Sequence, residues 1–372
     1  MTHSILHVIT TIELGGAEKQ LLTLASYQRE KGFDVEVLFL KGSPTLLESF
    51  LEADVKVDLG YVGLGFFQQI LKFRNRKSHR NLVIHAHLPR AELLCAISSK
   101  KKGFLVTRHN AEPFFPAAPT LLSKFLSRLV LSRAYSCISI SKAVKTYLIS
   151  SGEMNSLQNN CVIYYGLSRT NVFSGNKRDN NSEQIKLGTV SRLVPQKNLP
   201  LLLETLRELN TSSSRSFELA VVGSGPQRLE LQSLSISLGV EGVVSWLGQS
   251  KDVIAFYRSL DFFILSSNYE GFGLVLLEAM SQGIPVIARK ISAIPEVMGN
   301  EHPGLVDSDN PLDLARKLLE FVDNKLILNS CLDYQRMRLQ EFPISKTQMQ
   351  HELLYSRLLT QDGKDLNDGL DD

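Results

Sequence analysis

Short apolar runs alternate with amphipathic stretches along most of this chain, and this alternation restricts its possible folds more than any other feature of the sequence. A helix predicted over residues 17–30, for example, has an apolar face that includes Leu21, Leu24 and Ala25. Alternation of this kind indicates an α/β fold with parallel, doubly wound sheets. The strands predicted in the first half cover residues 5–10, 34–40, 82–85, 104–107, 136–140 and 161–164.

The pattern is interrupted at residues 168–183 by a polar segment rich in Asn and Ser, which predicts an interdomain linker. A chain of 372 residues is long enough for two domains. The alternation then restarts, so both halves are expected to be Rossmann-like. Strands of the second half are predicted at residues 185–190, 217–222, 243–246, 262–267 and 285–288, with helices at 199–209, from 226, and at 252–260.

The expected organisation has four parts. Residues 1–167 form an N-terminal domain and residues 168–344 a C-terminal domain, while a last helix over residues 345–360 packs back on the first domain. The polar, acidic residues 361–372 lack apolar periodicity and are expected to be disordered. Doubly wound sheets bind ligands at the carboxyl ends of their strands, so the site is expected in a cleft between two facing domains.

Cysteine usage and hydropathy favour a cytoplasmic protein. The four cysteines lie far apart with no C-x-x-C, which is typical of reduced core residues rather than of disulfides or a metal site. The first nine residues are too short and too polar for a signal peptide, and no window reaches about 18 consecutive apolar residues.

Charge is distributed unevenly between the two halves. Residues 1–166 contain 20 Lys and Arg against 12 Asp and Glu, whereas the remainder contains 21 and 26. In the basic half, the apolar residues 61–67 precede Lys72, Arg74, Arg76, Lys77 and Arg80. Such a segment suits an anionic membrane surface, and the alternative is an amphipathic helix with a solvated basic face.

Glu270 and Glu278 carry the most information about function. Glu270 is followed by Gly271, Phe272 and Gly273, and Glu278 lies on the apolar helix that comes next. Backbone amides of the glycine loop and the helix N-terminus suit an anion. The carboxylates would repel a phosphate but can accept hydrogen bonds from hydroxyls. A nucleotide sugar carries both kinds of group.

Arg192 and Lys197 follow the predicted strand at residues 185–190 and precede a helix. Two cations at the carboxyl end of a strand suit a diphosphate, because Arg chelates two oxygens and Lys supplies a compact charge. With these cations nearby, the two glutamates fit a nucleotide sugar better than they fit the acid and base of a glycoside hydrolase, which flank one bond.

Two further loops have glycines between a strand and a helix. Gly15 and Gly16 open the first helix, where a phosphate could approach the backbone, and a plain turn is the alternative. The segment from Gly223 to Pro226 is similar, but it is not G-x-G-x-x-G and does not predict a dinucleotide site.

His109 follows the predicted strand at residues 104–107, where it could donate to a phosphate or to a sugar hydroxyl. A structural role is the alternative. His85 and His87 are two residues apart and are expected to point to opposite sides of the chain. With no third imidazole expected beside them, no metal site is predicted.

Taken together, these motifs resemble the retaining family 4 glycosyltransferases of the GT-B fold, over nearly the whole chain. The E-x7-E segment Glu270–Glu278 is the most specific part. The chain departs from the family in having Ser191 before Arg192 and Tyr165 before Gly166, where the family commonly has Gly and Asn.

The resemblance implies a role for each matching residue. Glu270 would hold hydroxyls of the donor sugar and Glu278 the nucleotide ribose, while Arg192 and Lys197 would neutralise the leaving diphosphate. His109 would lie near the donor sugar and its phosphate. The remaining donor-binding positions implied are Gly16, Gly223, Gly271, Phe272, Gly273 and Leu274.

The expected function is therefore retaining, metal-independent transfer of a hexosyl or N-acetylhexosaminyl group. The donor is a nucleotide-diphosphate sugar, with UDP favoured over GDP, and no cofactor or nucleic acid is expected. The acceptor is a glycan or a lipid-linked hydroxyl in bacterial surface polysaccharide synthesis (lipopolysaccharide, capsule or exopolysaccharide). The enzyme would be cytoplasmic or peripheral on the inner membrane. The alternatives are a nucleotide-sugar epimerase of the same fold and a non-catalytic binding subunit.

Overall fold

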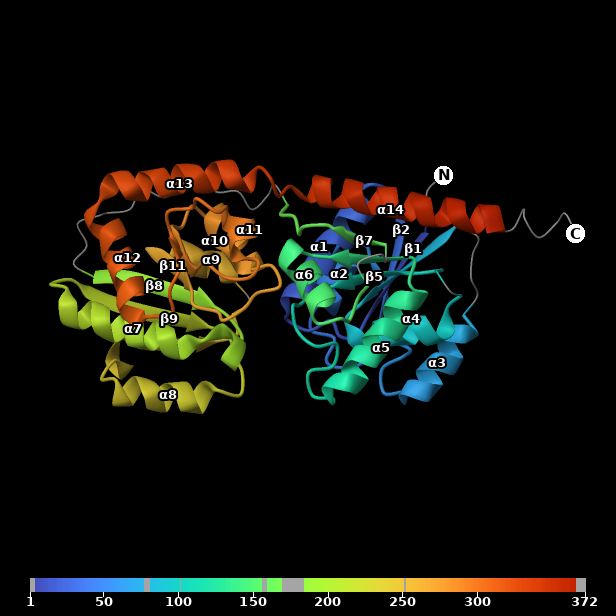
Figure 1. Cartoon of the computed structure of the whole chain (residues 1–372), viewed down its shortest axis with the longest axis horizontal. Coiled ribbons are helices and arrows are strands. Elements are labelled where there is room, and N and C mark those ends of the chain that lie inside the picture. Colours follow the sequence, from blue (N-terminus) through green and yellow to red (C-terminus); the bar gives the residue numbers. More distant parts are fainter. Residues whose placement is uncertain are drawn as a thin grey trace, which may run out of the picture. The chain divides into compact units, whose positions relative to one another are not determined.

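The computed structural model describes residues 4–76, 81–100, 102–155, 159–168, 184–250 and 252–365, with side chains to residue 360. The chain forms two compact units. Residues Met1–Ser168 and Phe342–Asp372 make up the N-terminal unit, and Arg169–Glu341 make up the C-terminal unit. Each unit contains one sheet covered by helices (Figure 1). Apart from Ser168, the predicted linker lies outside the described residues.

The sheet of the N-terminal unit has seven parallel strands in the order β3-β2-β1-β4-β5-β6-β7. The strand order reverses between β1 and β4, which is where doubly wound sheets bind ligands. The strands are β1 Ser4–Ile9, β2 Asp34–Phe39, β3 Lys56–Asp58, β4 Leu82–His87, β5 Leu105–Arg108, β6 Ser136–Ser139 and β7 Asn160–Val162. The helices are α1 Gly16–Glu30, α2 Leu47–Glu52, α3 Phe66–Arg74, α4 Pro89–Ser98, α5 Thr120–Arg133 and α6 Lys142–Ser150.

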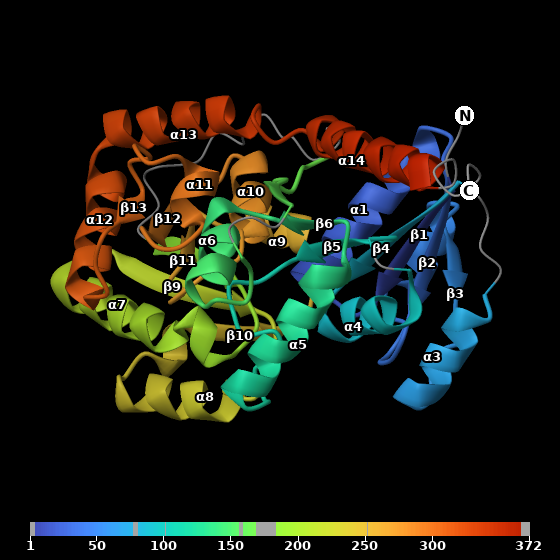
Figure 2. The same cartoon turned by 45° about the vertical axis from the view of Figure 1, so that its right-hand side comes forward.

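The last helix, α14 (Ile344–Asp365), belongs to the N-terminal unit. It packs against α1 and β4 (Figure 2) and adds Leu354, Tyr355 and Leu358 to the apolar core of that unit. Gly166 makes this return possible, because a Cβ at this position would lie 2.6 Å from the Cα of Ile344. The helix continues five residues into the segment expected to be a disordered tail, and the rest of that tail lies outside the described residues.

The sheet of the C-terminal unit has six parallel strands in the order β10-β9-β8-β11-β12-β13, reversing between β8 and β11. The strands are β8 Gln184–Val190, β9 Ser216–Val222, β10 Val244–Gly248, β11 Phe262–Leu265, β12 Val286–Arg289 and β13 Leu305–Val306. The α-helices are α7 Leu199–Ser212, α8 Arg228–Ser237, α9 Val253–Arg258, α10 Leu274–Ser281, α11 Ile294–Met298, α12 Pro311–Asp323 and α13 Lys325–Leu339.

The predicted fold class is confirmed, with two doubly wound α/β sheets. Cys95, Cys137 and Cys331 are buried and Cys161 is partly exposed, and all four are free thiols. Among the described residues, no helix has both the length and the apolar composition needed to cross a bilayer.

Candidate functional site

The loop after β8 carries both predicted cations. Its start is anchored beside β9, because the amide of Ser191 donates to the carbonyl of Val222. A short 3-10 turn, Pro195–Lys197, leads to Asn198, which has left-handed backbone angles (φ 47°, ψ 50°) and begins α7. Arg192 and Lys197 therefore lie at the carboxyl end of β8, where the strand order reverses.

Lys197 and Glu270 form an ion pair. The distance from Lys197 Nζ to Glu270 Oε1 is 2.6 Å, and the side chains are only 14% and 7% exposed. The same carboxylate oxygen accepts a hydrogen bond from the hydroxyl of Ser267 at 2.6 Å. The residues predicted to bind the diphosphate and the donor sugar thus meet at one point, although 73 positions separate them in the sequence.

Hydrogen bonds to backbone carbonyls fix the loop after β8 to the loop after β11. The Gln196 side chain donates to the carbonyl of Tyr269 at 3.0 Å, and the amide of Asn268 donates to the carbonyl of Gln196 at 2.8 Å. The hydroxyl of Ser266 donates to the carbonyl of Lys197 at 3.0 Å. Several hydrogen bonds between the two loops hold the charged pair in one geometry.

Arg192 differs from Lys197 in that its side chain is exposed. Its guanidinium donates to Gln196 Oε1 at 3.2 Å and forms no ion pair with any described residue. Arg192 therefore supplies a positive charge that no carboxylate of the described chain neutralises. An anion that enters this edge of the sheet can pair with it directly.

The loop after Glu270 ends in the amino terminus of α10. Gly271, Phe272 and Gly273 are buried, and Gly273 begins the helix at φ 90°, where a side chain would be strained. Gly273, the N-cap of α10, has no side chain that could cap the helix. The first amides of α10 therefore remain suited to an anion, and Leu274 supplies the first of them.

Glu278 lies one turn further along α10 and is held from α9. Its carboxylate accepts a hydrogen bond from the hydroxyl of Tyr257 at 2.8 Å. Burial, with the neighbouring charge of Glu278, raises the pKa of Tyr257 well above its usual range, so the tyrosine stays a donor at neutral pH. The two glutamates thus have different supports, Tyr257 for Glu278 and the β8 loop for Glu270.

Gly223, at the end of β9, is required by the close approach of the β8 loop. It has φ 140°, and a Cβ there would lie 1.8 Å from the carbonyl oxygen of Ser191. A Cβ on Gly225 would lie 2.4 Å from the carbonyl oxygen of Leu193. Both contacts are with backbone atoms, so a side chain would push the Arg192 loop away from the end of β9.

Gly223→Ala is accordingly expected to lower the free energy of unfolding by about 2–4 kcal/mol, because strain and overpacking add. Urea unfolding of the full-length chain measures this. Gly242→Ala is the matched control, since nothing lies within 4 Å of its added Cβ. Equal stability of the two variants would contradict the prediction.

Gly15 is the N-cap of α1 and Gly16 is the first residue of that helix, so the two glycines open it. A Cβ on Gly16 would meet nothing within 4 Å, so protein packing does not require glycine there. Glu18, in the first turn of α1, accepts a hydrogen bond from Thr11 at 2.7 Å. This buried carboxylate makes the end of α1 less favourable for a phosphate than the end of α10.

His109 belongs to the N-terminal unit, and both of its ring nitrogens have protein partners. Nδ1 bonds to the hydroxyl of Tyr165, and Nε2 lies 3.2 Å from Nδ1 of His87. Burial, with the nearby charge of Arg108, lowers the pKa of His109 to about 3. The ring is therefore neutral at physiological pH.

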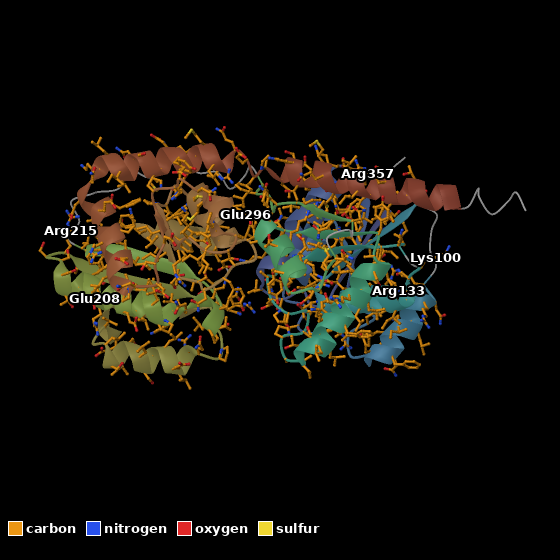
Figure 3. The ribbon with its side chains drawn as sticks, in the orientation of Figure 1. Lys100, Arg133, Glu208, Arg215, Glu296 and Arg357 are labelled. Carbon is orange, nitrogen blue, oxygen red and sulfur yellow. The ribbon has the colours of Figure 1, made fainter. Side chains whose placement is uncertain are left out.

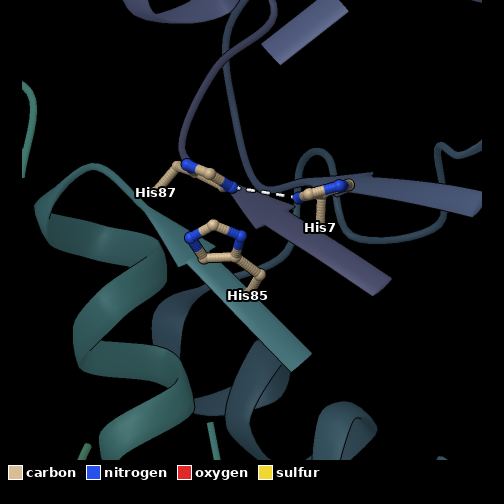
Figure 4. Close-up of side chains that lie close together, drawn as sticks. All are labelled: His7, His85 and His87. Atoms are coloured by element: carbon tan, nitrogen blue, oxygen red, sulfur yellow. Dashed lines mark hydrogen bonds between the residues drawn. The ribbon is translucent and has the colours of Figure 1, made fainter. Parts of the chain in front are cut away.

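The prediction that His85 and His87 point to opposite sides is wrong. Residues two apart on a strand share a face, and β4 continues through both. Their ring centroids are 4.2 Å apart. His7, on the neighbouring strand β1, is a third member, and ligand atoms of the three rings lie within 4.8 Å of one another (Figure 4). No sequence motif indicates Gln28, Tyr257 or Ser267, and Tyr165 stands out in the sequence only as a departure from the family pattern.

Comparison with known proteins identifies the family of each unit. Residues 14–167 match the family described as Glycosyltransferase Family 4, and residues 173–338 match Glycosyl transferases group 1. An uncharacterized glycosyltransferase of Methanocaldococcus jannaschii is 24% identical over 209 residues, 55% of each chain. The lipopolysaccharide core biosynthesis glycosyltransferase LpsE of Rhizobium meliloti is 29% identical over 165 residues, 44% of this chain and 47% of that one. The chain thus matches about half the length of these relatives.

Among solved structures, HepE of Anabaena, crystallised with UDP and glucose, has a TM-score of 0.80. It is 20% identical, and the match covers 95% of this chain and 99% of HepE. The two doubly wound sheets therefore have the GT-B architecture. The chain belongs to the family 4 glycosyltransferases.

Proposed function

We propose that this protein transfers a sugar from a nucleotide-diphosphate sugar to a hydroxyl of a glycan or lipid-linked acceptor, with retention of the anomeric configuration and without a metal. The observation that carries the proposal is the joined pair of Lys197 and Glu270 beside exposed Arg192 and the amino terminus of α10. This group offers positive charge to a diphosphate and a carboxylate to hydroxyls.

In the proposed reaction, the bond between the anomeric carbon and the diphosphate breaks, and negative charge builds on the phosphate oxygens. Arg192, Lys197 and the first amides of α10 stabilise that charge. Glu270 accepts hydrogen bonds from sugar hydroxyls, and Glu278 accepts them from the ribose. The acceptor attacks from the leaving-group face, and the departing phosphate takes its proton. The family resemblance implies that His109 contacts the donor sugar.

The donor is proposed to be a UDP-sugar, because HepE was crystallised with UDP and glucose. The named activity of LpsE favours an acceptor in bacterial surface polysaccharide, such as lipopolysaccharide. This would place the reaction in the cytoplasm, on the inner face of the membrane.

A thermal-shift screen against UDP, GDP, ADP and their sugars tests the donor, because a ligand specific to the native state raises the apparent stability. We expect UDP and a UDP-sugar to raise Tm more than the GDP or ADP compounds. Product analysis then distinguishes the alternatives. Conversion of the donor without an acceptor would indicate an epimerase, and binding without turnover would indicate a binding subunit.

The proposed contact with an anionic membrane rests on α3 and α5, which both pack against α4. Phe67 and Leu71 of α3 are 70% and 46% exposed, and Leu121 and Phe125 of α5 are 83% and 62% exposed. Large apolar side chains in this number on the two helices that pack against α4 suit an interface with lipid.

Among the described basic residues of this region, some form ion pairs and others do not. Lys72 and Arg74 are exposed and donate to backbone carbonyls, and neither forms an ion pair with a described residue. Arg76, in contrast, pairs with Glu36 and Asp58. Arg133 (Figure 3) donates to the carbonyls of Ala96 and Ser99 at the end of α4. Lys77 and Arg80 lie outside the described residues.

Flotation with anionic phosphatidylglycerol vesicles checks the membrane contact. The wild-type chain is expected to float, and the double variant Phe67→Ser/Phe125→Ser is expected to lose at least tenfold in vesicle partitioning. Leu229→Ser is the matched control, since Leu229 is 77% exposed on α8 of the C-terminal unit. A wild-type chain that stays wholly in the unbound fraction would contradict the proposal.

A further inference from the structure

Five of the eight histidines gather in the interior of the N-terminal unit, and four of them belong to one chain of hydrogen bonds. Starting from Tyr165, the chain passes through His109, His87 and His7 to Gln28. His87 Nε2 lies 3.0 Å from His7 Nδ1, and His7 Nε2 lies 2.8 Å from Gln28 Oε1 (Figure 4 shows the first of these contacts). All five side chains are buried.

The side-chain amide of Gln28 sets the direction of this chain. Its oxygen faces His7, and its nitrogen faces the hydroxyl of Tyr355 at 3.5 Å. An amide oxygen only accepts, so His7 must carry its proton on Nε2. The bond made by one ring nitrogen fixes the tautomer of a neutral imidazole, and Nδ1 of His7 is then an acceptor.

The same reasoning applies to each ring in turn. His87 donates from Nε2 to His7, and its own Nδ1 accepts from Nε2 of His109. His109 is therefore also protonated on Nε2, and its Nδ1 accepts from the hydroxyl of Tyr165. A proton at Nε2 of each ring satisfies every donor and acceptor along the path.

A second branch leaves Gln28 and is equally complete. The hydroxyl of Tyr355 lies 2.9 Å from Nδ1 of His85, and Nε2 of His85 lies 2.7 Å from the hydroxyl of Thr107. Gln28 donates to Tyr355, Tyr355 donates to His85 and His85 donates to Thr107. Burial favours the neutral rings that this pattern needs, since it lowers the pKa of His7 to about 4 and the pKa values of His85 and His87 well below the usual value.

Binding of a metal ion is the alternative role for His7, His85 and His87, because their ring nitrogens lie close enough together to coordinate one ion. Every ring nitrogen of the three already has a protein partner, however. An ion could bind only by displacing several of these bonds. The hydrogen-bonded arrangement accounts for all six nitrogens without such a loss.

We infer that His87, His7 and Gln28 are positioning residues that fix His109 in its Nε2–H tautomer, with Nδ1 presented as an acceptor for a hydroxyl. The inference rests on the proposed function for the role of His109 toward the donor. A ring held in this way accepts at Nδ1 and cannot donate from Nδ1 to a phosphate oxygen. Within the protein, the hydroxyl that bonds to Nδ1 of His109 belongs to Tyr165, which stands where the family commonly has Asn.

Long-range 1H–15N spectra of the histidine rings test the tautomer in the full-length protein at pH 7.5. We expect His109, His87 and His7 to be protonated on Nε2. In Gln28→Leu, which removes the acceptor, His109 should shift to a mixture of tautomers, and Gln28→Glu should restore the wild-type form. Thr107→Val affects only the second branch and should leave His109 unchanged. His302, in the C-terminal unit, accepts at Nδ1 from the amide of Gly304 and is an internal reference.

Three results would overturn the inference: a wild-type His109 protonated on Nδ1, a His109 spectrum that does not respond to Gln28→Leu, or loss of the Nε2–H signals of His7 and His87 on adding one equivalent of Zn²⁺. The third result would indicate a metal site. None of these readouts depends on turnover.

Activity gives a separate readout with UDP-glucose as the probe. Gln28→Leu is expected to lower kcat roughly tenfold, with inhibition by UDP unchanged, and Gln28→Glu is expected to recover most of the loss. If the wild-type chain has no turnover with any donor, the proposed function fails while the spectra still decide the tautomer. If turnover is normal in Gln28→Leu, the positioning role fails while the proposed function stands.

Discussion

Replacing Lys197 with methionine is expected to lower turnover about 100- to 1000-fold, the usual effect of removing one preorganised charge-stabilising group from a transition state. Methionine keeps the length and the apolar stem of lysine but removes the charge. The loss should appear mainly in kcat, since the negative charge on the diphosphate grows as the bond to the sugar breaks. Initial rates with a saturating nucleotide-sugar donor measure it.

Stability and activity need to be separated in this variant, because Lys197 is also the ion partner of Glu270. Removing one member of a largely buried pair leaves a carboxylate without its counter-charge and is expected to cost up to about 3 kcal/mol. Lys197→Met/Glu270→Gln removes both charges and should recover much of that stability. Glu270→Gln alone, which keeps the lysine, should be more active than the double variant, because only the double variant lacks the charge proposed to stabilise the leaving diphosphate.

Two single variants complete the comparison. Arg192→Met removes an exposed charge, so turnover should fall at least tenfold with little change in Tm. Lys317→Met removes the lysine of a surface pair with Glu320 on α12 and should change neither quantity. Wild-type rates in both Lys197→Met and Arg192→Met would show that these cations do not act on the leaving group.

The local parts of this site could be predicted from the sequence because they depend on one strand, its loop and the next helix. Strand β11, the glycine loop and α10 form such a unit, and so do β8 and its loop. Their spacing alone places a carboxylate and two cations at the carboxyl ends of strands. That Lys197 meets Glu270 depends on β8 pairing with β11, which follows from the doubly wound order.

The histidine chain could not be predicted in the same way. His7 faces His85 only because β1 pairs with β4 rather than with β2 alone, and Tyr355 arrives from the far end of the sequence on α14. The pair His85 and His87 is the one local sign of the cluster in the sequence. It was not recognised because the two side chains were assigned to opposite faces of β4. The edge strands β3 and β13, three and two residues long, are too short to show any periodicity.

The buried histidines predict that the N-terminal unit is unstable in mild acid. Burial lowers the pKa values of His7 and His351 to about 4 and that of His109 to about 3, against 6.5 for an exposed imidazole. Between these values the unfolded chain binds protons that the folded chain does not. The stability contributed by the neutral rings is therefore present above pH 6.5 and is lost as the pH falls toward 4.

The size of the effect follows from the linkage relation. At pH 5 each of these three groups removes about 2 kcal/mol of folding free energy, or about 6 kcal/mol together. His85 and His87 act in the same direction. Glu92 has the opposite effect on stability, because burial raises its pKa from 4.5 to about 7. At pH 5 the folded chain therefore binds a proton at Glu92 that the unfolded chain largely does not. This proton adds about 2–3 kcal/mol to the folding free energy at pH 5. The net loss is a large part of the roughly 5–15 kcal/mol that stabilises a typical domain.

The C-terminal unit should respond much less. Its buried histidine is His302, with a pKa lowered to about 4, which corresponds to about 2 kcal/mol at pH 5. The only tryptophan, Trp246, lies on β10 of this unit, so its fluorescence reports on the C-terminal sheet alone. Between pH 6.5 and 5, far-UV circular dichroism should therefore lose part of its helical signal while the fluorescence of Trp246 stays native.

Removing one imidazole at a time shows whether the rings cause this transition. His351 donates to the carbonyl of Thr347 and lies outside the hydrogen-bonded chain, so His351→Leu should move the circular dichroism midpoint to lower pH without disturbing His109. His302→Leu is the matched control and should leave that midpoint in place, because His302 belongs to the other unit. A single transition in which both signals change together, unmoved by His351→Leu, would mean that the acid sensitivity has another source than the buried rings of the N-terminal unit.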